Sequence, residues 1–324
     1  MKRVMLTLAA SAFLAGALAE TAPAQNYPAQ PIRMIISFGP GGGSDVIGRI
    51  IAQRMQEKLG QPVVVENRPG AGGTIGNALI ANSNKDGYTL GIMTAGQIIA
   101  PVMSKSPPYD TLKVFDSAGQ IATAGLLIVT RNDSPFKDIK SLVAAAKANP
   151  GKLNFASPGY GATQHMAAEL FKQVAGIDAQ QVQFRTSGEA LAALLSKQVD
   201  VLFDTITALL GQVQGGQVHP LAVTGKDRFP ATPNIPAAIE SGVTPNFDVT
   251  TWYGLFGPRG MPKPVVARLN ATLNEILQEA PVRERLTKAG VVVRGSTPEA
   301  FDKFMAEEFA KWTKVRIAAK LEQR

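Results

Sequence analysis

The chain has 324 residues but no cysteine, and it has only two histidines, His165 and His219. A chain without cysteine has no disulfides, no thiol catalysis and no thiolate metal sites. The two histidines do not stand at the short spacing of a metal-binding motif, so neither a metal nor another cofactor is predicted. Aromatic residues make up only 6% of the chain, and the basic residues are scattered along it. That pattern does not indicate a nucleic-acid partner.

Long apolar runs are absent after the N-terminus, and none approaches the ~20 residues of a membrane span. At the N-terminus, two basic residues precede an apolar stretch over residues 4–19, and small residues follow. This pattern is typical of a secretory signal peptide. Cleavage after Ala19 or after Ala24 would fit, and we favour Ala24 because a strand-like segment begins soon after it. The sequence therefore predicts a signal peptide over residues 1–24 and an exported protein.

The chain carries a net charge of +8, and 45% of its residues are hydrophobic. The hydrophobic content is sufficient for a well-buried core, and the length favours two domains. The positive charge would suit an acidic ligand or an anionic surface. A solvated basic surface without a specific partner is the simpler interpretation of the same charge.

Strand-like runs, glycine-rich turns and amphipathic helices alternate along the chain. The apolar run over residues 34–38 leads into the glycine-rich turn 39–45 and then into a helix over residues 45–59. Two further strand candidates, 63–65 and 88–94, also lead into glycine-containing turns and helices. This alternation predicts an α/β fold with a largely parallel sheet.

Two apolar segments, 126–130 and 247–256, are interpreted as strands that cross between two α/β lobes. Between them the alternation of strands and helices restarts, and after the second segment the chain is mostly helical. We therefore predict a discontinuous first lobe of residues 25–125 and 249–324, with a second lobe of residues 126–248 inserted into it.

The predicted strands end in segments that suit a ligand site. In open α/β sheets, ligands bind at the carboxyl ends of the strands, and glycine turns that open helices present free N–H groups to anions. The six segments that meet both conditions are 39–45, 70–74, 95–96, 157–163, 185–188 and 204–205. We expect them to face one cleft.

The glycine turns do not carry a known nucleotide or catalytic motif. None has the lysine of a phosphate loop, and Ser44 stands at the third glycine position of a dinucleotide fingerprint. A nucleophile elbow of the form Gly-x-Ser-x-Gly is also absent. The sequence thus has no positive indication of an enzyme.

Three polar residues each permit more than one role. Asp45 is placed to cap a helix, to fix its loop or to hold a ligand amino group. His165 is either a local cap or packing residue, or a donor of one hydrogen bond into the cleft. Asp204 follows a predicted strand and would suit a hinge, a loop anchor or a ligand contact.

Ordered motifs run through nearly all of the mature chain. They are Tyr27-Pro-x-x-Pro-Ile-Arg33, Phe38-Gly-Pro-Gly-Gly-Gly-Ser-Asp45, Val64-Val-Glu-Asn-Arg-Pro-Gly-Ala-Gly-Gly73, Lys85-Asp-Gly-Tyr-Thr-Leu90, Ser157-Pro-Gly-x-Gly-x-x-x-His165 and Trp252-Tyr-Gly-Leu-Phe256. On these motifs the chain resembles the Bug (TctC-like) family, the periplasmic solute-binding receptors of tripartite tricarboxylate transporters.

The resemblance implies a two-lobed periplasmic binding protein of type II that is not an enzyme. Such a receptor captures a small organic anion, a mono- or dicarboxylate, in the cleft between its lobes and delivers it to the membrane permease subunits. We expect a periplasmic monomer. The alternatives are an exported sensor or interaction module that acts with a signalling partner and, less favoured, a secreted α/β enzyme.

The resemblance also implies which loop residues hold the ligand, through backbone N–H groups and hydroxyls of both lobes. Carried over by position, they are Phe38, Gly41, Gly42, Ser44, Asp45, Gly96, Ser157, Gly159, Thr163, His165 and Asp204. The segment 185–190 departs from the family pattern, so Arg185 and Ser187 are the expected selectivity residues. Arg185 would either grip a second carboxylate or replace a solvent-facing lysine.

Overall fold

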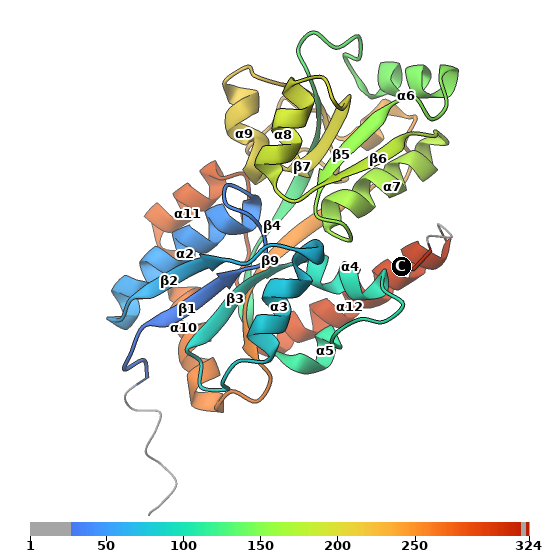
Figure 1. Cartoon of the computed structure of the whole chain (residues 1–324). Helices are drawn as coiled ribbons and strands as arrows, with labels where there is room; N and C mark the ends of the chain where they lie inside the picture. The colour runs from blue at the N-terminus through green and yellow to red at the C-terminus, as the bar shows by residue number, and fades with distance from the viewer. Residues whose placement is uncertain (1–26, 319–321, 324) are drawn as a thin grey trace, which may run out of the picture.

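A computed structural model describes residues 27–318 and 322–323 of the chain. The predicted signal peptide, 1–24, lies outside these residues. Within them, no helix has the length and apolar character that a membrane crossing requires. The described part is a mixed α/β structure built on one continuous sheet that runs through two halves (Figure 1).

The first half holds the N-terminal strands and the C-terminal helices. Its strands are β1 (Ile32–Ile36), β2 (Val63–Asn67), β3 (Thr89–Thr94), β9 (Thr250–Pro258), the first part of β4 (Phe115–Thr130) and the short β10 (Val292–Val293). The order β2-β1-β3 is parallel, and β9 then pairs antiparallel with both β3 and β4. The helical segments are α2 (Gly43–Leu59), η1 (Ala71–Gly73), α3 (Thr74–Ala81), α4 (Gly96–Val102), α5 (Thr111–Val114), α10 (Lys263–Gln278), α11 (Ala280–Lys288) and α12 (Pro298–Ala318).

The second half is made from the segment between β4 and β9. Its strands are β5 (Asn154–Pro158), β6 (Gln180–Phe184), β7 (Val201–Thr205) and β8 (His219–Val223). Its helical segments are α6 (Ile139–Ala148), α7 (Thr163–Ala175), α8 (Ser187–Leu195), α9 (Ile206–Gln214) and η2 (Ala238–Ser241). Strand β5 pairs parallel with β6 and β7, while β7 and β8 pair antiparallel with β4.

Strand β4 joins the two halves. Its residues 115–125 pair with β9, and its residues 126–129 pair with β7. Sequence periodicity predicted a strand only over residues 126–130, because the first part of β4 is rich in small and polar residues and is interrupted by two register shifts. The structure therefore lengthens this strand to 16 residues.

Aromatic side chains fill the core of the second half. Phe171 of α7 is fully buried, and its ring centroid lies 5.6 Å from that of Phe203 and 5.5 Å from that of Phe247. Such close rings add to the free energy gained by burying their area. In the first half, Phe301 of α12 packs edge-on against Trp252 of β9, with centroids 5.3 Å apart. Phe301 and Trp312 of α12 are both buried, so these aromatic side chains belong to the core.

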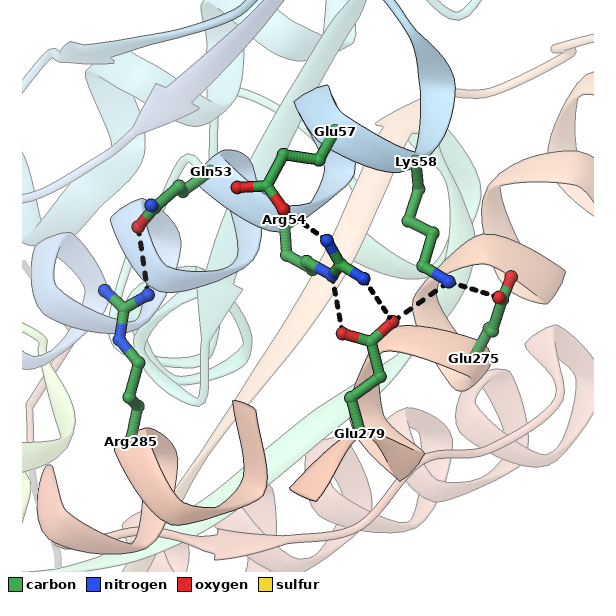
Figure 2. A network of polar contacts seen from close by, with 7 residues as sticks. All are labelled: Gln53, Arg54, Glu57, Lys58, Glu275, Glu279 and Arg285. Atoms are coloured by element: carbon green, nitrogen blue, oxygen red, sulfur yellow. Dashed lines mark hydrogen bonds and ion pairs between the residues drawn. The ribbon is translucent and has the colours of Figure 1, made fainter. Parts of the chain in front are cut away.

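An ion network ties α2 to the junction between α10 and α11 (Figure 2). Arg54 donates to both carboxylate oxygens of Glu279, from Nε at 2.5 Å and from NH2 at 3.0 Å. Lys58 lies 3.0 Å from the same carboxylate and also contacts Glu275. The hydrogen bonds from Arg54 and then Lys58 lower the pKa of Glu279 to about 2. These pairs hold α2, whose first turn lies at the candidate site, against the C-terminal helices.

We expect Glu279→Gln to lower the melting temperature by a few degrees at most, because exposed ion pairs contribute little to stability. The loss should shrink at high salt, which screens such pairs. Because the pKa of Glu279 is lowered on folding, its contribution is present above the pKa of an unfolded glutamate and is lost as the pH falls through about 2. Thermal melts at low and high salt test this, with Glu307→Gln as the exposed control. A loss that grows with salt would contradict the expectation.

Candidate ligand-binding site

A cavity lies where the N-termini of four helices meet between the two halves. Its walls include the starts of α2, α7, α8 and α9, and each of these helices follows a strand, namely β1, β5, β6 and β7. The lining residues are Phe38, Gly39, Gly42, Gly43, Ser44, Thr94, Pro158, Gln164, Arg185, Thr186, Ser187, Thr205, Thr251 and Tyr253. Each helix N-terminus carries a partial positive charge, so the four together favour an anion.

Two of these helices have a side-chain cap and two do not. Thr186 Oγ1 accepts from the backbone N–H of Glu189 at 3.1 Å in α8, and Thr205 Oγ1 accepts from that of Ala208 at 3.2 Å in α9. The N-cap residues of α2 and α7 are Gly42 and Ala162, and neither provides a side-chain hydrogen bond. Neither residue has a side-chain oxygen or nitrogen that could accept a hydrogen bond. The first N–H groups of α2 and α7 are therefore available to ligand oxygens.

The remaining walls of the cavity are mostly hydroxyl groups. Ser44 and Thr94 come from the first half, Ser187 and Thr205 from the second, and Thr251 from the crossing strand β9. Arg185 is the one charged side chain among the described lining residues. The cavity in this structure has room for only one or two water molecules. Its hydroxyl groups, helix N-termini and guanidinium suit an oxygen-rich anion, and an organic acid would enter only when the two halves separate.

The two halves meet closely around the cavity, with glycines at the contacts. A Cβ atom on Gly39 would lie 2.4 Å from Thr186 Cγ2, and one on Gly72 would lie 2.2 Å from the carbonyl oxygen of Tyr160. Cβ atoms essentially never approach other atoms so closely. Any larger residue at these two positions would force the halves apart.

The β1–α2 loop is held in place by Asp45. Its Oδ2 accepts from the Gly41 backbone N–H at 3.0 Å, and its Oδ1 accepts from Arg49 Nε at 3.0 Å and from Asn67 Nδ2 at 2.9 Å. Asn67 also donates to the Phe38 carbonyl at 3.0 Å. Burial alone would raise the pKa of Asp45, but these hydrogen bonds outweigh it and lower the pKa. Of the roles considered above, Asp45 has that of a loop anchor, and it does not line the cavity.

The Phe38 ring explains why two predicted glycines lie behind the cavity wall. Cβ atoms on Gly96 and Gly159 would lie 3.5 Å and 3.2 Å from this ring. The ring therefore separates both glycines from the cavity that it lines.

Three contacts of His165 lie within its own loop and helix. Its Nδ1 accepts from the Gly161 backbone N–H at 3.1 Å, and its ring lies 4.8 Å from that of Tyr160. Its Nε2 is 3.9 Å from Glu169. This geometry matches the local packing role and not a donor into the cavity.

The structure thus divides the predicted site residues into two groups. Five of them line the cavity, namely Phe38, Gly42, Ser44, Arg185 and Ser187. Eight lie outside the lining, namely Gly41, Asp45, Gly96, Ser157, Gly159, Thr163, His165 and Asp204. Some of these support the wall. Ser157 Oγ bonds to Gln181 and Gln183, and Thr163 Oγ1 lies 3.5 Å from Thr251 Oγ1.

Several lining residues were missed by sequence reasoning. Gly39, Gly43 and Thr186 belong to segments that were expected to face the cleft, but they were not named as site residues. Gln164 lies in the first turn of α7, beside residues that were named. Thr251 and Tyr253 come from β9, which was interpreted only as a crossing strand. A strand that is buried on both faces reads as one apolar run, and such a run does not show which face meets a ligand.

Comparison with known proteins identifies the family. The model of the tripartite tricarboxylate transporter family receptor, TctC, matches residues 47–321. The chain belongs to the TctC receptor family. A TctC relative from Pseudomonas sp. strain P51, the UPF0065 protein in the tcbD-tcbE intergenic region, is 37% identical over 91% of this chain and 88% of its own length. Protein BugT of Bordetella pertussis is 34% identical over 92% of both chains.

Solved structures of similar proteins share the TctC fold. The R. palustris protein Rpa4515, solved with adipate, is 28% identical, with a TM-score of 0.88 over 91% of this chain and 98% of that one. MatC (Rpa3494) from Rhodopseudomonas palustris, solved with bound malate, is 31% identical, with a TM-score of 0.84 over 89% and 99%. The resemblance stated from the motifs is confirmed, and so is the α/β periplasmic-binding-protein fold. Members of this family and these neighbours are binding proteins and not enzymes.

Proposed function

We propose that this TctC receptor is a periplasmic protein that captures a small organic acid in the cavity between its halves. The observation that carries the proposal is the convergence of four helix N-termini, two of them without side-chain caps, on one cavity. Carboxylate oxygens accept hydrogen bonds from such N–H groups and gain from the helix dipoles. The adipate and malate in the two neighbouring structures are ligands of this class.

The two halves would act as lobes that close over the solute. We propose that residues 25–125 and 249–324 form one lobe and residues 126–248 the other, with β4 and β9 crossing between them. Closure removes water from the site and strengthens the charge-assisted hydrogen bonds to the carboxylate. As a monomer, the closed receptor would then deliver the solute to the membrane permease subunits of a tripartite transporter.

Calorimetric titration against a panel of acids tests the proposal. The panel should hold acetate, butyrate, succinate, malate, adipate and citrate, with the amides of succinate and adipate as uncharged controls. We expect at least one mono- or dicarboxylate to bind and its amide not to bind, because the amide lacks the charge that the helix N-termini favour. The proposal would be wrong if no acid of the panel and no wider set of organic anions bound.

Arg185 is expected to determine the preference for a second carboxylate. We expect Arg185→Gln to weaken binding of malate or adipate about tenfold or more, as for a lost hydrogen bond between charged groups. Monocarboxylates of similar length should lose less. Arg185→Lys should recover only part of the affinity, because lysine keeps the charge without the planar fork that binds a carboxylate bidentately.

The matched control for this prediction is Lys152→Gln. Lys152 is exposed in the same half of the molecule and does not line the cavity, so this variant removes the same charge at a distance. Calorimetric titration of each variant with both acid types makes the comparison. If both acid types lose the same affinity in Arg185→Gln, Arg185 contributes general attraction and not selectivity.

A further inference from the structure

A buried carboxyl group lies directly behind the wall of the anion cavity. Asp204 is the last residue but one of β7 and has no exposed surface, and its Oδ1 accepts from the Thr205 backbone N–H at 2.7 Å and from Gln164 Nε2 at 3.3 Å. Its Oδ2 has no hydrogen-bond partner among the described residues. Thr205 and Gln164 both line the cavity. Residues that bond to this carboxyl therefore form part of the cavity wall.

The surroundings of Asp204 do not supply a compensating cation. The groups that act on it are the Ser187 hydroxyl from α8, the N–H of Thr205 at the end of β7 and the Gln164 amide from α7. The nearby Tyr253 phenol from β9 is itself buried, and burial raises its pKa, so it stays neutral. Arg185 is the one charged lining side chain in the described part, and it is not among the groups that shift Asp204.

Burial raises the pKa of Asp204 toward neutral pH. Desolvation raises its pKa to about 6, although the Ser187 hydroxyl and the hydrogen bonds from Thr205 and Gln164 oppose the rise. A second carboxylate that enters a shared, poorly hydrated site disfavours ionisation further, because two like charges repel strongly there. The entry of the solute should consequently raise the proton affinity of Asp204.

We propose that Asp204 binds a proton when the solute carboxylate enters the cavity, so that the receptor captures an organic anion together with a proton. This inference rests on the proposed function, because it needs an anion in the cavity. The protonated carboxyl is neutral, so it does not repel the carboxylate of the solute. When Oδ2 carries the proton, it is a hydrogen-bond donor. Asp204 thus acts on the solute through the charge behind the cavity wall, without direct contact.

The sign of the pH dependence follows from linkage. Well below its free pKa of about 6, Asp204 is protonated in the free and the bound receptor and contributes no pH dependence to the affinity. As the pH rises from the free pKa to the higher pKa of the bound state, the proton must be taken from solution, and the affinity falls by up to tenfold per pH unit. Above both values the affinity is again constant.

Calorimetry on the wild-type protein tests the inference directly. Malate and adipate are titrated between about pH 6.5 and about pH 8.5, where both carboxyl groups of each acid are ionised, in triethanolamine and in Tris buffers, because neither buffer is an anion that would compete for the cavity. We expect the affinity to fall as the pH rises. We also expect the observed enthalpy to differ between the two buffers by an amount that reports the uptake of up to one proton.

Two variants assign the proton to Asp204. Asp204→Asn keeps the Oδ1 acceptor but cannot titrate, so its affinity should be independent of pH, its enthalpy should show no proton uptake, and it should bind more tightly than wild type near pH 8.5. Asp178→Asn removes an exposed carboxylate at the opposite end of the second half and should keep the wild-type pH dependence. Circular dichroism spectra establish that both variants fold.

The outcomes separate this inference from the proposed function. Wild-type binding that does not change with pH and takes up no proton overturns the inference alone, and so does an Asp204→Asn variant that keeps the wild-type dependence. If Asp204→Asn fails to fold, the two-buffer comparison on wild type decides. No binding of any organic anion at any pH overturns the proposed function and this inference with it.

Discussion

We expect Gly72→Ala to weaken binding of the solute by about tenfold or more, although Gly72 does not line the cavity. A Cβ at this position would lie 2.2 Å from the backbone carbonyl oxygen of Tyr160, which belongs to the other half. Because this neighbour is backbone, it cannot turn aside as a long side chain would. The two halves must separate, and the apparent affinity falls with the population of the closed, binding-competent state.

The matched control for this prediction is Gly60→Ala. Gly60 ends α2 at φ +71°, and Gly72 has a similar φ of +65°, so alanine meets the same backbone strain at both positions, about 1 kcal/mol. A Cβ on Gly60, however, meets no atom within 4 Å. Both variants should therefore lose similar stability, and only Gly72→Ala should lose affinity.

Titration calorimetry with malate or adipate measures the affinities, and small-angle X-ray scattering measures whether the protein contracts when the acid is added. Wild type and Gly60→Ala should contract, and Gly72→Ala should stay extended. Equal affinities for the two variants would show that the contact between Gly72 and Tyr160 does not limit closure.

The second large effect concerns stability. We expect Phe171→Ala to lower the free energy of unfolding by about 3–5 kcal/mol, the usual cost of deleting a fully buried phenylalanine. Phe171 has no exposed surface, and its ring lies among those of Phe155, Phe203 and Phe247. Three rigid rings relax poorly into the space that is left, which favours the upper end of this range.

Urea unfolding followed by circular dichroism measures this loss. Leu195→Ala on α8 of the same half serves as the control, because Leu195 is 45% exposed and its truncation should change stability by about 0.5 kcal/mol or less. A loss below about 1 kcal/mol for Phe171→Ala would mean that the aromatic cluster repacks around the missing ring.

Much of the fold is predictable from the sequence because local chemistry and tertiary packing agree. The sequence places the end of α2 at Gly60, and the structure shows the left-handed conformation that glycine favours there. Aspartate is a favoured N-cap residue, and Asp138 forms a capping box with Ser141 at the start of α6. Long-range pairing was harder to predict, because the first part of β4 gains its strand conformation from β9 and not from an apolar pattern of its own.

The site was predictable by segment but not by residue. The segments follow from sheet topology, since strand ends and helix starts gather at one edge. The individual side chains depend on contacts that no spacing reports. Asp45 turns back to the N–H of Gly41, and Gly96 and Gly159 lie under the ring of Phe38. Tyr253 reaches the cavity from a strand whose two faces are both buried.

The position of β9 has a consequence for how the chain assembles. In the sheet β9 lies between β3 and β4, yet in sequence it follows all strands of the second half. During synthesis, β3 therefore keeps an unpaired edge until Thr250–Pro258 has been made, whereas residues 126–223 already contain every partner that β5 and β6 need. Shortening the chain before Thr250 would thus remove a central strand of the sheet and not a dispensable tail.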